Sequence, residues 1–391
     1  MRDVYIIGAG MTRFGLYDGR HLPYKTIYEL GAEACMAALD HAGISHRKIE
    51  AAFCGNGSAP PNCCQNITAP VGISGVPAFN HENGCAAGSC ALKHAWETVA
   101  NGMYDVALVI GADKWSPPPG VSRETRLLVT PSGMNLNQDV AGAFGTALLA
   151  LIANAHMHEY GTTREQLAKI AVKNKRNGAM NPYAQFQKEV TLEDVLHSRM
   201  ISDPLTLLQC CPQSDGAAAV VICTGDIARQ YTSKPIKIPF ITESSARYKG
   251  MEGRLSEFKC FQRASQSAYE ACGIGPDDLD IVEVHDDFTA LELVAYEDLG
   301  LCPKGEAGRC IDEGRFDFGG KCVVSPSGGL LAKGHPIGAT GVAQLVEIAW
   351  QLRGECGKRQ VDGAKIGLAH NGGGVGDGYE PGAVTITIAT I

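Results

Sequence analysis

Two residues in glycine-rich surroundings are suited to nucleophilic chemistry. In HENGCAAGSCAL, Cys85 comes directly after a glycine and before a run of small residues that is typical of a helix start. Unpaired backbone N–H groups and the positive end of the helix dipole at that position lower the pKa of a thiol and favour the thiolate. The pattern therefore predicts a nucleophile that attacks a carbonyl carbon. The alternative is a small apolar residue in a tight corner, because free cysteine is commonly buried and the chain has fifteen cysteines.

A histidine further along the chain could supply the base that such a thiol needs. In SPSGGLLAKGHPIGATGVAQ, His335 stands between a glycine and a proline at the start of another expected helix. Protonation is disfavoured near a helix N-terminus, so a neutral imidazole there can act as a base toward a nearby thiol. A loop histidine more often serves as a surface or hydrogen-bonding residue, but the glycine-rich setting and the relation to Cys85 favour the base.

That relation is a weak internal repeat. AALDHAGISHRKIEAAF resembles SAYEACGIGPDDLDIVEV, and GCAAGSCA, from Gly84, aligns with GHPIGATG, from Gly334. The two matches come in the same order, which indicates a duplicated α/β unit with Cys85 and His335 at equivalent positions. β-Branched runs such as VYIIGAG and AVTITIAT alternate with helical patterns such as TIYELGAEACMAALDHAG, which predicts a layered α/β architecture.

The repeat predicts an N-terminal half, residues 1–233, and a C-terminal half, residues 234–391, in a chain long enough for two core-forming units. The segment from about 115 to 200 opens with SPPPG and has no counterpart in the second half. We expect it to be an insertion that covers a site.

The composition excludes several classes of protein. The formal charge of −8 argues against a general nucleic-acid binder, because affinity for a polyanion depends on clustered Lys and Arg. No C-x-x-C pair occurs, and the doublets Cys63-Cys64 and Cys210-Cys211 lack zinc-ribbon spacing, so we expect reduced thiols and no metal site. No apolar run reaches membrane-spanning length and the N-terminus lacks a secretory pattern, so we expect a cytoplasmic protein.

Five motifs in order, NGCAAGSCAL, SDGAAAVVI, EVHDDF, GGLLAKGHPIGATG and AHNGGGVGDG, resemble the thiolase superfamily over essentially the whole chain. Within it, the sequence most resembles the archaeal and bacterial thiolases related to the sterol-carrier-protein thiolases. The resemblance implies two similar halves in a five-layered α-β-α-β-α fold, assembled as a homodimer or a dimer of dimers. It also implies a coenzyme A thioester as substrate and no covalently bound cofactor.

The same resemblance implies roles for single residues. Cys85 would be the acylated nucleophile, and His335 the base that activates it. His285, which opens HDDF, falls where other thiolases have the asparagine of a NEAF motif that helps hold the thioester oxygen; a simple backbone contact is the alternative. The backbone N–H groups of Cys85 and Gly372 would form a second oxyanion hole, unless the glycine run is only a turn. Asp215, in SDGAAAVV, is expected to be a structural cap.

The sequence departs from the family at the second acid/base. Most thiolases use the cysteine of a C-x-G-G-G motif, and His370 stands at that position in this chain. The sterol-carrier relatives use instead the cysteine of an HDCF motif, and Asp287 stands at that position here. A buried Asp287 with a raised pKa could take over, as could His370 if it faces the pocket. Alternatively, the acceptor is a carbon that is already nucleophilic, or the reaction is a retro-aldol cleavage. The Cys-His-His set of ketosynthases is a weaker match.

The nucleotide end of coenzyme A has no obvious binding motif, since neither a P-loop nor a dense basic patch occurs. Lys173, Lys175 and Arg176, in KNKRNG, are the best basic residues for it, although a charge run is more often a solvated face. Relatives of this type often assemble with a small OB-fold, zinc-ribbon protein that helps hold the substrate.

We therefore predict an acyl-CoA C-acyltransferase of the acetyl-CoA acetyltransferase type. The alternatives are a C-acyltransferase acting on a carbon nucleophile other than a CoA ester, a retro-aldolase working with an OB-fold partner, and a non-catalytic acyl-CoA-binding or scaffold subunit.

Overall fold

The computed structural model describes residues 1–57, 59–120, 145–247, 254–374 and 379–391. Its strands are β1 (Val4–Met11), β2 (Ala51–Gly55), β3 (Ala78–His81), β4 (Val106–Asp113), β5 (Met200–Ser202), β6 (Leu205–Thr206), β7 (Gly216–Thr224), β8 (Ile236–Ser244), β9 (Ile281–Glu283), β10 (Val323–Val324), β11 (Ile366–Gly373) and β12 (Ala383–Thr390). Its α-helices are α1 (Ile27–Ala42), α2 (Cys63–Thr68), α3 (Ala87–Ala100), α6 (Gly145–Tyr160), α7 (Arg164–Ala179), α8 (Leu192–Leu196), α9 (Gly225–Tyr231), α10 (Lys259–Cys272), α11 (Thr289–Asp298), α12 (Ala307–Asp312), α13 (Gly329–Ala332) and α14 (Thr340–Arg353). Short 3₁₀ helices are η1 (His46–Lys48), η2 (Ala69–Val71), η3 (Leu207–Gln209), η4 (Pro276–Asp278), η5 (Ile337–Ala339) and η6 (Gly357–Arg359).

The strand order repeats in the two halves of the chain. Among the described residues, ten strands are joined in the order β10-β9-β11-β12-β8-β1-β7-β4-β2-β3. Read outward from the centre, the first half runs β1-β7-β4-β2-β3 and the second runs β8-β12-β11-β9-β10. The halves meet where β1 pairs antiparallel with β8, through Tyr5 opposite Lys237 and Ile6 opposite Ile236. The duplication predicted from the sequence is therefore present in the topology.

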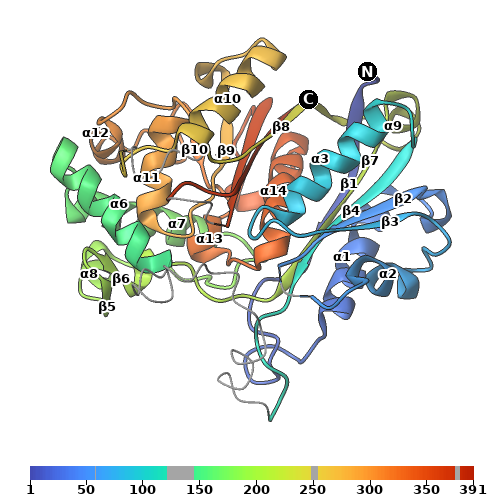
Figure 1. Ribbon diagram of the computed structural model, residues 1–391, viewed down its shortest axis with the longest axis horizontal. Coiled ribbons are helices and arrows are strands. Elements are labelled where there is room, and N and C mark those ends of the chain that lie inside the picture. Colours follow the sequence, from blue (N-terminus) through green and yellow to red (C-terminus); the bar gives the residue numbers. More distant parts are fainter. Residues whose placement is uncertain (58, 121–144, 248–253, 375–378) are drawn as a thin grey trace.

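The helices form layers on either side of these two half-sheets. Helices α3 and α14 pack against each other in the middle, where α14 contacts strands of both halves and the Trp96 indole N–H of α3 donates to the Ile238 carbonyl of β8 at 2.9 Å. Helix α1 covers the outer face of β1 and β7, and α10 covers β8 and β12. Figure 1 shows α3 (cyan) and α14 (orange-red) between these outer helices. The result is the expected α-β-α-β-α arrangement.

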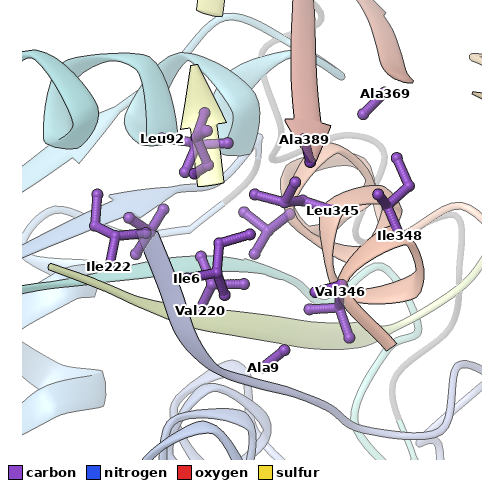
Figure 2. Close-up of a cluster of buried hydrophobic side chains, with 14 of the residues drawn as sticks. Ile6, Ala9, Leu92, Val220, Ile222, Leu345, Val346, Ile348, Ala369 and Ala389 are labelled. Atoms are coloured by element: carbon purple, nitrogen blue, oxygen red, sulfur yellow. The ribbon is translucent and has the colours of Figure 1, made fainter. Parts of the chain in front are cut away.

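The core at the centre is made by apolar side chains from all of these layers. Leu92 of α3 and Leu345 and Ile348 of α14 lie beside Ile6 of β1 and Val220 of β7, and all five are buried (Figure 2). Strands covered on both faces are expected to be almost continuously apolar, and the burial of every residue of β4 and β7 agrees. This packing holds the N-terminal ends of α3 and α14 next to each other.

The glycines matched by the repeat end equivalent helices. Helix α1 begins with a capping box between Thr26 and Glu29 and ends at Gly43, whose φ is 64°. Helix α10 ends at Gly273, whose φ is 66°. Both have the left-handed conformation that favours glycine at a helix end, which explains why these two positions match in the sequence.

The part of the predicted insertion from residue 145 to about 200 lies over the second half. Helix α7 packs against α11 and α13, and α6 packs against α11. Residues 121–144 of the predicted insertion lie outside the described residues. Within the described ranges, every helix is too short or too polar to cross a bilayer.

Candidate active site

Cys85 lies in a tight turn two residues before α3, as the sequence predicts. The preceding Gly84 has a φ of 53°, and a Cβ there would lie 2.8 Å from the backbone N of Gly374. A Cβ on Gly373 would lie 2.2 Å from the Asn83 carbonyl oxygen. Only glycine fits this close approach, so the end of β11 lies directly against the turn that carries the thiol.

His335 contacts that thiol and is fixed in one orientation. Its Nε2 lies 3.2 Å from the Cys85 Sγ, and its Nδ1 lies 2.7 Å from the Thr340 hydroxyl. The Thr340 hydroxyl donates its one hydrogen to the Pro336 carbonyl at 3.0 Å, so it accepts from the His335 Nδ1–H. The unprotonated Nε2 of the neutral imidazole therefore faces the thiol and can accept its proton. The predicted pair is thus brought together from the turn before α3 and the segment between α13 and η5.

Both members of this pair are neutral at rest. Burial raises the pKa of Cys85 to about 12, with the negative charges of Asp287 and Asp113 adding to the effect, although the backbone N–H of Gly374 lowers it. Burial lowers the pKa of His335 to about 3. The prediction that the helix N-terminus gives a thiolate is wrong, because loss of hydration outweighs the helix dipole at this buried position.

His285 faces the same thiol from the loop after β9. One ligand atom from each of Cys85, His285 and His335 lies within 4.8 Å of the others. The Asn371 amide donates to the His285 Nδ1 at 3.0 Å. A neutral His285 therefore carries its hydrogen on Nε2 and can donate it to a substrate oxygen. Burial, with smaller effects of the neighbouring histidines, holds the pKa of His285 well below its usual value.

Asn371 is a residue that the sequence analysis did not single out. Its Oδ1 accepts from the Ser89 hydroxyl at 3.0 Å, and that hydroxyl also lies 2.9 Å from the Ala86 carbonyl oxygen. Asn371 thus links His285 to the first turn of α3. It lies within the AHNGGGVGDG motif, directly before the glycines, which was the available signal.

Asp287 lies two residues after His285, on the same loop. Its Oδ1 is buried and has no hydrogen-bond partner among the described residues. Burial raises the pKa of Asp287 to about 7, although the backbone N–H groups of Phe288 and of Asp287 itself lower it. Its carbonyl oxygen accepts from the Cys211 N–H at 2.7 Å, which fixes the loop. A carboxyl group that is half ionised near neutral pH is suited to general acid/base catalysis.

A cavity of about 170 Å³ joins these groups. Its wall includes Cys85, His285 and Asp287, and the other lining residues are glycines or largely apolar: Gly145, Leu148, Leu149, Phe258, Leu291, Gly372, Gly373, Gly374, Tyr379 and Pro381. Leu148 and Leu149 belong to α6, so a helix of the predicted insertion contributes to the cavity wall. A larger cavity of about 590 Å³, beside Trp350, contains none of the predicted catalytic groups.

The remaining backbone donors lie at the end of β11. Gly372 lines the cavity, and its role as an oxyanion donor stays a prediction. Gly374, which the sequence analysis did not name, is the glycine whose backbone N–H interacts with the Cys85 thiol. The glycine run is thus more than a turn, because it lets backbone donors approach the nucleophile.

His370 lies behind the site instead of in it. It is fully buried in β11, its ring packs edge-on against Phe261 at 4.1 Å, and it is absent from the cavity wall. Its Nδ1 accepts from the His285 backbone N–H at 3.4 Å. Burial lowers the pKa of His370 to about 3. Of the two residues expected to replace the second cysteine, Asp287 lines the cavity and His370 does not.

The basic run of α7 does not reach the cavity either. Lys173 is buried, with its Nζ 2.8 Å from a Glu292 carboxylate oxygen, and Lys175 is buried and donates to the Leu331 carbonyl. Arg176 pairs with Asp317 at 3.2 Å. The two lysines tie α7 to α11 and α13, so their positions give no support to the predicted contact with coenzyme A.

Asp215 is a structural cap, as predicted. Its buried carboxylate accepts from the backbone N–H groups of Tyr17, Trp115 and Ser116 at 2.6–2.8 Å and lies 3.0 Å from the Lys114 Nζ. The carboxylate thereby fixes the chain where the insertion begins.

Known proteins are similar to this chain over nearly its whole length. A family model described as "Thiolase, N-terminal domain" matches residues 4–226, and one described as "Thiolase C-terminal domain-like" matches residues 243–379. Acetyl-CoA acetyltransferase of Methanothermobacter thermautotrophicus is 40% identical over 383 residues, covering 96% of this chain and 97% of that protein. Sterol carrier protein 2 of Bos taurus is 38% identical, covering 98% of this chain and 72% of that protein. A solved structure described as "Ltp2-ChsH2(DUF35) aldolase" has a TM-score of 0.81 and 25% identity, covering 98% of this chain and 97% of that one.

Proposed function

Because the chain belongs to the thiolase family, we propose that it is an acyl-CoA C-acyltransferase of the acetyl-CoA acetyltransferase type, with Cys85 as the acylated residue. The observation that carries this proposal is the 3.2 Å contact between the Cys85 Sγ and the unprotonated Nε2 of His335. A nucleophile, its base and a third group that orients the base are the arrangement that covalent catalysis requires.

In the first half-reaction, Cys85 attacks the carbonyl carbon of an acyl-CoA while its proton moves to the His335 Nε2. Since both groups are neutral at rest, the proton transfer accompanies the attack and the buried site does not have to hold an ion pair beforehand. Backbone N–H groups of Cys85, Gly372 and Gly374 receive the oxygen that becomes negative. The C–S bond to coenzyme A then breaks, and His335 returns the proton to the departing thiolate.

In the second half-reaction, Asp287 takes a proton from the carbon beside the thioester of the acceptor. The carbanion attacks the acyl carbon on Cys85, the C–S bond to Cys85 breaks, and the thiolate takes up a proton to replace the one that Asp287 removed from the acceptor. The Nε2–H of His285 holds the thioester oxygen on which negative charge collects during proton removal. Support for Asp287 comes from its place in the cavity wall and from its buried, unpartnered Oδ1.

Retro-aldol cleavage is a second proposal with its own support. It needs a base and an oxyanion donor but no acyl-cysteine, and Asp287 with His285 could supply these. The similar structure at a TM-score of 0.81 is described as an aldolase. A chain that cleaves a β-hydroxyacyl-CoA without forming a Cys85 adduct would favour this reaction.

We also propose an OB-fold, zinc-ribbon partner that holds the nucleotide end of coenzyme A, and a homodimeric or tetrameric core. The name of the similar complex includes a DUF35 protein, which supports such a partner. Lys173 and Lys175 are engaged within the fold, which leaves the phosphate groups to other cations. Co-purification of a small zinc protein, with the mass of the complex measured by light scattering, tests both proposals.

The first experiment is intact-protein mass spectrometry after incubation with acetyl-CoA or longer acyl-CoAs. We expect the wild type and Cys90→Ala, a change at another buried cysteine near the start of α3, to gain the mass of one acyl group. Cys85→Ala should gain none. An adduct that persists in Cys85→Ala contradicts the proposal. So does the lack of any adduct in a wild-type chain that binds coenzyme A, an outcome that favours the aldolase or a scaffold.

A further inference from the structure

The three groups around the nucleophile also have the composition of a metal site. One thiol and two imidazoles contribute ligand atoms that all lie within 4.8 Å of one another, and the Cys85 Sγ to His335 Nε2 distance is 3.2 Å. Zinc binds sulfur at about 2.3 Å and imidazole nitrogen at about 2.0–2.1 Å, which places neighbouring ligands of a tetrahedral ion about 3.3–3.6 Å apart. Small side-chain shifts would therefore close these ligands around one ion.

Each imidazole makes a hydrogen bond through its other nitrogen, and in metal-binding histidines that nitrogen usually donates. The His335 Nδ1 donates to Thr340, so its Nε2 is ready to bind. The His285 Nδ1 accepts from Asn371, which leaves the hydrogen on Nε2. A half-turn of the Asn371 amide would let its oxygen accept from the His285 Nδ1–H and free Nε2. The Ser89 hydroxyl, 2.9 Å from the Ala86 carbonyl oxygen, could then donate there and accept from the turned amide.

Two of the three ligands, Cys85 and His285, line the cavity. Asp287 lines this cavity, and its buried Oδ1 has no hydrogen-bond partner among the described residues. Carboxylate oxygen is a zinc ligand, and three protein ligands with one open position are typical of reactive zinc sites. With a thiolate and this carboxylate, the charge of a divalent cation would be balanced. Elsewhere in the described ranges, no other group of three His, Cys, Asp or Glu side chains has such a geometry.

We propose that the resting site reversibly binds one thiophilic divalent cation, Zn²⁺ being the best match, through Cys85, His285 and His335. On binding, the S–H proton of Cys85 leaves to solvent and a sulfur–metal bond forms; release reverses both changes. Because the same sulfur cannot carry a metal ion and an acyl group, metal binding and acylation exclude each other. The inference concerns the ligand set alone and does not depend on the reaction that the site catalyses.

Co²⁺ is the spectroscopic probe for the test. Reduced, metal-free, full-length protein is titrated with Co²⁺ and then with Zn²⁺ as competitor. We expect one Co²⁺ per chain, a thiolate-to-cobalt charge-transfer band that Zn²⁺ abolishes, and one proton released per ion in calorimetry with different buffers. Cys85→Ala should lose the band, and His285→Ala should weaken binding more than the about 10- to 100-fold typical for loss of an outer ligand partner.

Cys63→Ser is the matched control, because Cys63 is a buried cysteine at the start of α2 and belongs to the hydrophobic cluster on the other face of the first half-sheet. Its band should equal that of the wild type. Thr340→Val removes only the partner of His335, so the band should remain while affinity falls. Circular dichroism and thermal unfolding establish that each variant is folded.

Two results would overturn the inference: no cobalt–thiolate band in folded, reduced wild type, or a band that survives Cys85→Ala. Failure of metal binding leaves the acyl adduct of Cys85 untouched, and failure of acylation leaves the cobalt band untouched, so the two proposals are tested separately.

Discussion

The two half-reactions should respond differently to pH. Removal of a proton from the acetyl group requires ionised Asp287, and burial raises the pKa of Asp287 to about 7. The ionised fraction is then about 0.09 at pH 6 and about 0.91 at pH 8, so this step should be about tenfold faster at pH 8. The rate rises with pH because the base is the deprotonated form.

Acylation should be nearly flat over the same range. His335, with a pKa lowered by burial to about 3, and Cys85, with a pKa raised to about 12, each keep one protonation state between pH 6 and 8. Rapid quenching and intact-mass measurement follow the adduct. Uptake of solvent deuterium into the methyl group of acetyl-CoA follows proton removal by Asp287 separately from carbon–carbon bond formation.

Asp287→Asn should retain the Cys85 adduct, lose about 10²- to 10⁴-fold in deuterium uptake, and lose the pH slope. Asp277→Asn, a change at an exposed carboxylate, is the control and should behave as the wild type. Asp287→Cys restores a thiol at this position and should gain acetoacetyl-CoA cleavage. Deuterium uptake that is flat from pH 6 to 8, or a tenfold slope in acylation itself, would refute this assignment of roles.

Three further substitutions test the supports of the site. Gly338→Ala places a Cβ 2.4 Å from a neighbouring backbone atom, so urea unfolding should show a loss of about 1–3 kcal/mol. Asn371→Ala removes the hydrogen bond to His285 and should slow deuterium uptake, while intact-mass measurement still shows the Cys85 adduct. Lys173→Met leaves Glu292 buried without its cation, so the free energy of unfolding should fall by about 3–5 kcal/mol. The acyl-CoA concentration for half-maximal acylation of the folded protein should stay unchanged.

The fold followed from patterns that are local in the sequence. Runs such as VYIIGAG and AVTITIAT lie within β1 and β12, and the glycines of the repeat end α1 and α10 where left-handed backbone is needed. The Cys85–His335 pair was also accessible, because the repeat relates the two helix starts. In these cases the residue type is determined by the backbone conformation at its own position or by the helix at whose start it lies.

Other features of the site depend on what surrounds a residue in space. The thiol pKa was predicted in the wrong direction because the sequence does not show which groups surround the Cys85 thiol and reduce its hydration. Lys173 and Lys175 belong to a polar-looking run, yet α7 packs its polar face onto the second half. The ligand set of Cys85, His285 and His335 spans most of the chain and has no zinc-finger spacing, so a search for local cysteine patterns finds nothing there.

The equivalence of Cys85 and His335 has a consequence for the origin of the site. Two identical half-length chains joined by a two-fold axis would present the same residue at both positions, a thiol facing a thiol or an imidazole facing an imidazole. Neither combination provides both a nucleophile and a base. Because the two halves of this chain are encoded separately, each position can hold a different residue, and the asymmetry on which the chemistry depends requires this.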